Sequence, residues 1–223
     1  MDSTALRDGR DDAPAESARR RRTRARLLDA AFDVFAEQGV RAASVETIAE
    51  AAGFTRGAFY SNFSTKEELF FALMEREKTM RLEQLDQGLA QHLAPLVESG
   101  VTEIDDAQVI DIVTKILELQ SDDRRWWLVQ SEFQLLALRD ATIAGGYLAF
   151  QDGFYRDLTE IVITALASAH RRFTIDPAEA VRVIAELCAS GEAHALLAGD
   201  ERKFAERLSE SVDRKSTRLN SSH

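Results

Sequence analysis

Between Ser44 and Phe63 the sequence SVETIAEAAGFTRGAFYSNF leaves room for two short helices and almost nothing between them. Ser44 is a good N-cap for the first helix, and Gly53 ends that helix. Thr55 can cap the second helix, RGAFYSNF, so that only Gly53 and Phe54 join the two. Two short helices around a tight glycine turn are the helix-turn-helix pattern, in which the second helix enters the DNA major groove. The spacing therefore predicts a helical DNA-binding module.

The second half of this module, from the turn onward, is free of negative charge. No acidic residue occurs from Gly53 to Lys66, although the chain has a formal net charge of −10. Residues 17–66 contain nine basic and five acidic residues, whereas residues 67–212 contain 14 basic and 27 acidic residues. A basic N-terminal part and an acidic remainder place a polyanionic partner at the N-terminal part. An acid in this segment would repel the DNA backbone, which explains its absence.

Apolar residues at helical spacing continue on both sides of the module. Before it, Leu27, Leu28, Ala31, Val34 and Phe35 form one stripe, and Gly39 follows Gln38 as a stop signal. After it, Ser64 and Glu67 predict a capping box for a helix over residues 65–89. Further helices are expected at 105–120, 124–139, 142–170, 177–198 and 201–212. Because no recurrent strand alternation occurs, the predicted fold class is all-α.

The composition excludes several classes of protein. Apolar residues make up 45% of the 223 residues, which is enough for a folded core. No run of 18 apolar residues is present, so we expect no membrane span and no membrane partner. The N-terminus is polar, without an apolar signal-peptide core. Cys188 is the single cysteine, which excludes an intrachain disulfide and fits the cytoplasm.

The two ends of the sequence are not expected to join the fold. Residues 1–17 are rich in Asp, Arg, Ala and Ser without apolar periodicity, and we interpret them as a disordered arm. Residues 213–223, DRKSTRLNSSH, read like a translated sequencing-library adapter, and we interpret them as an artefact. The natural chain is then expected to differ after Val212, with a longer last helix.

The segment from Arg26 to Phe70 resembles the N-terminal domain of TetR-family transcriptional regulators. The similarity extends without gaps over about residues 21–81, and it is most specific in AAGFTRGAFY and in FSTKEEL. The resemblance implies an N-terminal three-helix DNA-binding domain with a helix-turn-helix, followed by a C-terminal helical bundle for ligand binding and dimerisation. We place the first domain at residues 18–81, with the helix-turn-helix at 44–63, and the second at 82–212.

The resemblance also assigns DNA contacts. It carries base reading onto Thr55, Arg56 and Gly57, and phosphate contacts onto Ser44, Thr47, Tyr60 and Lys66. Arginine can donate two hydrogen bonds to one guanine in the major groove. Glycine costs about 1 kcal/mol against alanine in a helix, a cost that makes sense if a side chain at position 57 would strike the DNA. We add Ser61 to the candidates, although Ser61 and Asn62 replace the aromatic–histidine pair common in the family.

Each of these assignments has a simpler alternative. Arg56 can be a solvated surface charge, Tyr60 a core aromatic residue and Lys66 merely the start of a helix. The basic run RRRRTRAR, Arg19 to Arg26, can be a solvated charge run or an arm that contacts the minor groove or the DNA backbone. On the second interpretation Arg24 joins the candidate DNA-binding residues.

Aromatic residues gather in the C-terminal part. A helical bundle lined with aromatic side chains is a usual small-molecule site, but the same residues can also be ordinary core. The glycine pair Gly145–Gly146 can kink its helix beside such a cavity or permit close packing. The candidate pocket residues are Trp126, Trp127, Phe133, Tyr147, Phe150 and Phe154.

The sequence contains no pattern typical of an enzyme. It has no nucleophile–base set, no phosphate-binding loop and no metal-ligand spacing, and Cys188 and His194 fall on different sides of a helix. We therefore predict no enzymatic activity, no cofactor and no metal. The predicted function is a transcriptional regulator, a repressor that binds a palindromic operator as a homodimer and is released by a small molecule. The alternative is a helical small-molecule-binding protein or enzyme without DNA binding.

Overall fold

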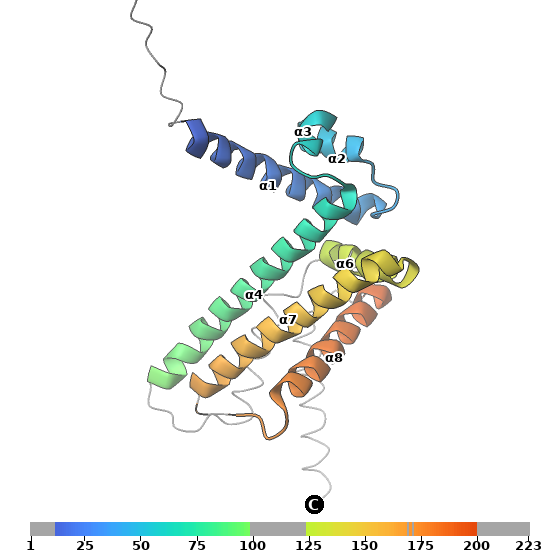
Figure 1. Ribbon diagram of the computed structural model, residues 1–223. Helices are drawn as coiled ribbons and strands as arrows, with labels where there is room; N and C mark the ends of the chain where they lie inside the picture. Colours follow the sequence, from blue (N-terminus) through green and yellow to red (C-terminus); the bar gives the residue numbers. More distant parts are fainter. Residues whose placement is uncertain (1–11, 99–123, 169, 171, 200–223) are drawn as a thin grey trace, which may run out of the picture. The chain divides into compact units, whose positions relative to one another are not determined.

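The computed structural model describes residues 12–98, 124–168, 170 and 172–199, and these residues form helices joined by short turns (Figure 1). No strand occurs within these ranges, so the all-α prediction is confirmed for the part of the chain that is described. The helices are α1 (Asp12–Gln38), α2 (Val45–Ala51), α3 (Arg56–Tyr60), α4 (Lys66–Glu98), α6 (Arg124–Arg139), α7 (Ala141–Ser168) and α8 (Pro177–Ala198).

Most helix boundaries follow the local signals in the sequence. Helix α6 has the predicted bounds, and α7 differs from its prediction by one residue at the start and two at the end. Helix α8 also has the predicted bounds, because Asp176 accepts a hydrogen bond from the Glu179 N–H and Gly199 closes the helix with φ of 65°. The helices expected at 105–120 and 201–212, and the adapter-like residues 213–223, lie outside the described residues.

Three boundaries differ from the prediction by more than two residues. Helix α1 begins at Asp12, so residues 12–17 are helical where we expected a disordered arm. The alanines and the glutamate among them favour helix, and extending an existing helix is easier than nucleating one. Helix α3 ends at Tyr60 rather than at residue 63. Helix α4 continues to Glu98, beyond the expected end at residue 89.

The predicted capping box of α4 is displaced by one residue. Thr65, not Ser64, is the cap, because its hydroxyl accepts from the Glu68 N–H at 3.0 Å and its carbonyl accepts from Leu69. The Glu68 carboxylate, not that of Glu67, accepts from the Ser64 N–H at 2.7 Å. Both Ser-x-x-Glu and Thr-x-x-Glu occur in the sequence STKEE, and the structure selects the second.

The chain divides into two compact units, and the division falls inside α4. The first unit comprises the chain up to Glu75 together with Leu128–Glu132, and the second comprises Arg76–Trp127 and the chain from Phe133 on. The sequence analysis placed the boundary after residue 81. Helix α4 therefore contributes residues to both units.

The first unit has a core drawn from four helices. The whole predicted stripe of α1 is buried, and Phe35 meets Phe70 of α4 edge to face at 5.4 Å between ring centroids. Helix α2 adds Ile48 and Ala49, and α3 adds Phe59, whose ring is fully buried. Phe59 and Phe63 are thus both in the core, which fixes the short helix α3 against the domain.

The second unit packs α7 against α8 and buries an aromatic centre. Phe133 of α6 is fully buried, and its ring contacts Tyr147 and Phe150 of α7 at centroid distances of 4.9 and 5.5 Å. Ala180, Val181 and Ala195 are the buried residues of α8.

Candidate nucleic-acid interface

Helices α2 and α3 form the predicted helix-turn-helix. The Ser44 hydroxyl accepts from the Thr47 N–H at 3.0 Å and caps α2, and the Thr55 hydroxyl accepts from the Ala58 N–H at 3.2 Å and caps α3. Between them Gly53 has φ of 71°, a conformation that glycine adopts without the strain imposed by a β-carbon. The Phe54 N–H donates back to the Ala49 carbonyl at 2.8 Å. The turn is therefore tight because of local hydrogen bonds that the sequence already specifies.

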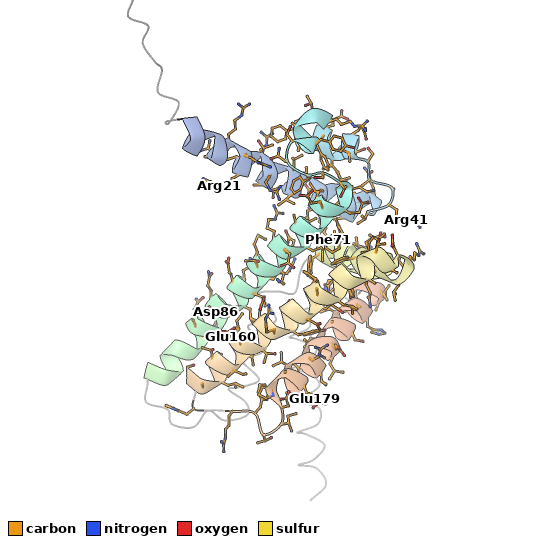
Figure 2. The ribbon with its side chains drawn as sticks, in the orientation of Figure 1. Arg21, Arg41, Phe71, Asp86, Glu160 and Glu179 are labelled. Carbon is orange, nitrogen blue, oxygen red and sulfur yellow. The ribbon has the colours of Figure 1, made fainter. Side chains whose placement is uncertain are left out.

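Two arginines of α1 fasten this module. Arg26 donates to the Ala52 carbonyl at 2.8 Å, and its guanidinium lies 4.6 Å from the centroid of the Phe54 ring. Arg24 donates to the Asn62 carbonyl, and its guanidinium lies 4.0 Å from the centroid of the Phe63 ring. Arg24 and Arg26, the last two arginines of the basic run, thus both have a structural role. The sequence analysis proposed Arg24 as a DNA contact and gave Arg26 no individual role. Figure 2 marks Arg21 on the same helix and Arg41 in the turn that follows it.

The predicted base-reading residues share an exposed surface. Thr55, Arg56 and Gly57 are all exposed, at the start of α3. Tyr60, one turn later, is 47% exposed, although its ring also contacts the buried Phe59 edge to face. Ser61 is exposed and donates to the Gly57 carbonyl at 2.9 Å, so its hydroxyl also belongs to the end of the helix. Ser44 is exposed at the start of α2, and Thr47 is half-buried.

Arg56 is paired within the protein. Its Nη1 lies 2.6 Å from the Glu46 carboxylate of α2, and its Nη2 lies 3.5 Å from the Tyr60 hydroxyl. The guanidinium carbon is 5.4 Å from the centroid of the Tyr60 ring. The hydrogen bond to Tyr60 and the negative charge of Glu46 raise the pKa of Arg56. The tertiary structure thus brings an acid to a segment that contains none in the sequence.

Gly57 is not required by the fold. A β-carbon built on Gly57 would come within 4 Å of one side-chain atom, the Thr55 hydroxyl oxygen, at 3.8 Å. The backbone of Gly57 is not among those with positive φ. Neither backbone strain nor internal crowding therefore explains the glycine.

Lys66 differs from the other candidates because its ammonium is engaged internally. It donates to the Val40 carbonyl at 2.7 Å and to the Ala43 carbonyl at 2.8 Å, in the loop that precedes Ser44. The ammonium has three N–H donors, so two are used within the domain. A phosphate contact stays a prediction for Lys66, and the position of the α1–α2 loop depends on this residue in either case.

The candidate ligand residues are only partly brought together. Phe133, Tyr147 and Phe150 form the aromatic centre of the second unit, and burial raises the pKa of Tyr147. Phe154 pairs with Tyr155, and Trp126 and Trp127 are half-buried on α6.

Basic residues lie close to aromatic rings of the second unit. Lys78 lies 5.8 Å from the centroid of Phe150, and Arg81 lies 4.5 Å from that of Trp126. Arg182 of α8 lies 4.6 Å from the centroid of Tyr155. Lys78 also lies 3.7 Å from the Asp157 carboxylate. These cation–π contacts stabilise the packing of the unit, and the sequence analysis did not predict them.

The described residues offer neither a metal site nor a membrane span. Within the ranges that the structure describes, no three histidine, cysteine or acidic side chains are grouped so that they could hold a metal ion. In the same ranges no helix combines the length and apolar character needed to cross a lipid bilayer.

Sequence comparison links the first unit to known regulators. Residues 27–73 match the family described as bacterial regulatory proteins, tetR family. The HTH-type transcriptional regulator AcrR of Shigella flexneri is 47% identical over 53 residues, which are 24% of this chain and 25% of AcrR. The HTH-type transcriptional repressor KstR2 of Rhodococcus jostii is 44% identical over 59 residues, 26% of this chain and 27% of KstR2. The match thus spans about a quarter of the length of these curated relatives.

Structural comparison extends the similarity beyond that segment. A TetR-family regulator from Mesorhizobium loti superposes with a TM-score of 0.63 at 16% identity, over 88% of this chain and 94% of that one. FadR of Bacillus subtilis, solved with stearoyl-CoA, gives 0.58 at 21% identity, over 84% and 94%. A transcriptional regulator from Saccharomonospora viridis, solved with choline, gives 0.56 at 16% identity, over 86% and 93%.

These proteins are transcriptional regulators, not enzymes. Residues 27–73 of this chain therefore match the tetR family of bacterial regulatory proteins, and the described helices have the fold seen in TetR-family regulators.

Proposed function

We propose that this protein is a DNA-binding transcriptional repressor that binds a palindromic operator as a homodimer and is released by a small molecule. The observation that carries the proposal is the exposed start of α3. Arg56, Gly57 and Tyr60 lie there on the second helix of the helix-turn-helix, and the fold itself does not require the glycine at position 57. This is where a helix-turn-helix presents its base-reading side chains. A protein that binds the bacterial chromosome must be where that DNA is, so we also propose the cytoplasm as its location.

Exposed apolar residues of α8 support the homodimer. Val183 and Leu187 are four residues apart and Ile184 and Leu187 are three apart, so they share a helix face. Val183 and Ile184 are each 51% exposed, and Leu187 is 67% exposed. A twofold dimer through such a face would carry two copies of α3, and its operator would then repeat the same half-site with twofold symmetry.

The first prediction concerns Arg56. Arg56→Ala should weaken binding to the operator by about 1–3 kcal/mol and relax the base preference at one position in each half-site. The operator is first obtained by selecting bound duplexes from a random DNA library with the wild-type protein. Binding of each single-base variant of that operator is then measured by fluorescence anisotropy.

A suitable control is Arg139→Ala, since Arg139 is an exposed arginine in the second unit. The control should keep the wild-type base preference. If the wild-type protein enriched no sequence, the proposal would be wrong, and a helical small-molecule-binding protein or enzyme without DNA binding would become the better description.

The second prediction concerns the ligand, for which we propose the aromatic centre of the second unit. Solved relatives hold stearoyl-CoA and choline, which differ in charge and size. We propose α4 as the coupling element, because it contributes residues to both units. A ligand found by thermal-shift screening, starting with these two compounds, should weaken operator binding about 5- to 150-fold.

Thermodynamic linkage makes this prediction strict. The operator must weaken ligand binding by the same factor that the ligand weakens operator binding. Calorimetric titration of the ligand into the free protein and into the protein–operator complex measures both. A tight ligand that leaves operator affinity unchanged would contradict ligand release.

A further inference from the structure

We infer that Glu46 of α2 is a specificity-determining residue. It holds the guanidinium of Arg56 for base reading, and its own carboxylate makes contact of this surface with DNA phosphate unfavourable. This inference rests on the proposed function, because it concerns how the same surface distinguishes one DNA sequence from another. It goes beyond that function by assigning a role to an acid on the neighbouring helix.

The geometry of the pair is the first argument. The Arg56 Nη1 and the Glu46 Oε1 are 2.6 Å apart, the distance of a charge-assisted hydrogen bond. The two side chains are 62% and 56% exposed, so the pair lies at the surface and is not part of the core. Tyr60 contacts the same guanidinium from within α3. Arg56 is therefore held by one group on each helix of the helix-turn-helix.

The donor count is the second argument. An arginine side chain has five N–H donors in a fixed plane. A bidentate contact with guanine uses two of them, so Arg56 can read a base while it keeps its bond to Glu46. An arginine held before binding loses less conformational freedom on binding, and so the pair favours the base-reading orientation.

Charge is the third argument. Glu46 lies between Ser44 and Thr47, two residues for which we propose phosphate contacts. A carboxylate beside DNA phosphates is repelled by them, whatever the base sequence. Glu46 therefore costs affinity on every duplex. On the duplex with the correct base, the oriented Arg56 offsets this cost, and on other duplexes it does not. The difference in binding free energy between the two kinds of duplex is the sequence specificity.

A simpler role for Glu46 also exists. It is the acidic residue in the first turn of α2, where a negative charge stabilises a helix. That role predicts a change in stability and no change in base preference. Base preference is therefore the measurement that separates the two roles.

The test uses Glu46→Gln and the matched control Glu50→Gln, which removes the same charge from an exposed position on the same helix. Both variants should bind random-sequence DNA more tightly than the wild type. Only Glu46→Gln should flatten the base preference. The ratio of the affinities for the preferred base and for the other bases should fall by about three- to fivefold, an effect that an exposed ion pair can supply. The flattening should occur at the operator position that Arg56→Ala also relaxes.

A double-mutant cycle completes the test. In the Arg56→Ala background, Glu46→Gln should no longer change base preference, because its effect depends on the arginine. The inference is overturned if Glu46→Gln and Glu50→Gln alter the preference alike, or if the effect of Glu46→Gln persists without Arg56. A wild-type protein that selects no sequence would overturn the proposed function and this inference with it.

Discussion

Gly57 is the residue at which stability and DNA binding are expected to change in opposite directions. A β-carbon at this position has room in the free protein, and alanine favours helix more than glycine does. Gly57→Ala should therefore raise the free energy of unfolding, by up to about 1 kcal/mol. The same methyl group should weaken operator binding, because it extends from the exposed start of α3 toward the DNA.

Gly145 provides the control for this prediction. It is a helical glycine of α7 whose β-carbon would meet nothing within 4 Å. Gly145→Ala should give a similar gain in stability, measured by urea unfolding, without a loss of operator affinity. If Gly57→Ala bound the operator as tightly as the wild type, the role of Gly57 in close approach would be refuted.

At the scale of the element, the first turn of α4 makes a pH-dependent contribution to stability. The hydrogen bond from the Ser64 N–H lowers the pKa of Glu68. A carboxyl group whose pKa is lower in the folded state stabilises the fold above its unfolded pKa, about 4.3 for glutamate. The contribution is lost as the pH falls through the lower folded value.

Glu68→Gln should therefore reduce the acid dependence of unfolding. Below the unfolded pKa of glutamate the wild type loses the contribution of Glu68, whereas the variant has none to lose, so their midpoints in urea should converge as the pH falls. Glu67→Gln is the matched control, since it removes the neighbouring acid, which does not accept from Ser64. A wild-type pH dependence in Glu68→Gln, or the expected change in Glu67→Gln instead, would show that the cap is assigned to the wrong residue.

At the scale of the whole molecule, dimerisation is expected to depend on α8. Leu187 is 67% exposed, so a charge there would not enter the core of the monomer. Leu187→Glu should weaken the dimer, because a charge would be buried in an apolar interface. Operator binding should weaken with it, because two linked α3 helices bind more tightly than one.

Analytical ultracentrifugation measures the first effect, and anisotropy on the full operator and on one half-site measures the second. Leu138→Glu is the control, since Leu138 of α6 is 79% exposed but does not belong to α8. The affinity for a single half-site should stay unchanged in both variants. An unaltered dimer constant in Leu187→Glu would exclude the α8 face as the interface.

The sequence by itself determined what depends on neighbouring residues. The caps Ser44 and Thr55 and the stop glycines Gly39 and Gly53 all act within about four residues, and all were predicted. The buried stripe of α1 follows from helical periodicity in the same way. Where two caps competed, at Ser64 and Thr65, local rules gave no preference, and the prediction was wrong by one residue.

Only the tertiary structure decided which distant side chains meet. Glu46 and Arg56 are on separate helices, and their contact depends on how the turn at Gly53 sets one helix against the other. The two carbonyl partners of Lys66 are 26 and 23 residues away from it in the chain. Arg81 and Trp126 likewise meet across two helices. No regular spacing in the sequence predicts such pairs, because loop geometry and core packing bring them together rather than the helical repeat.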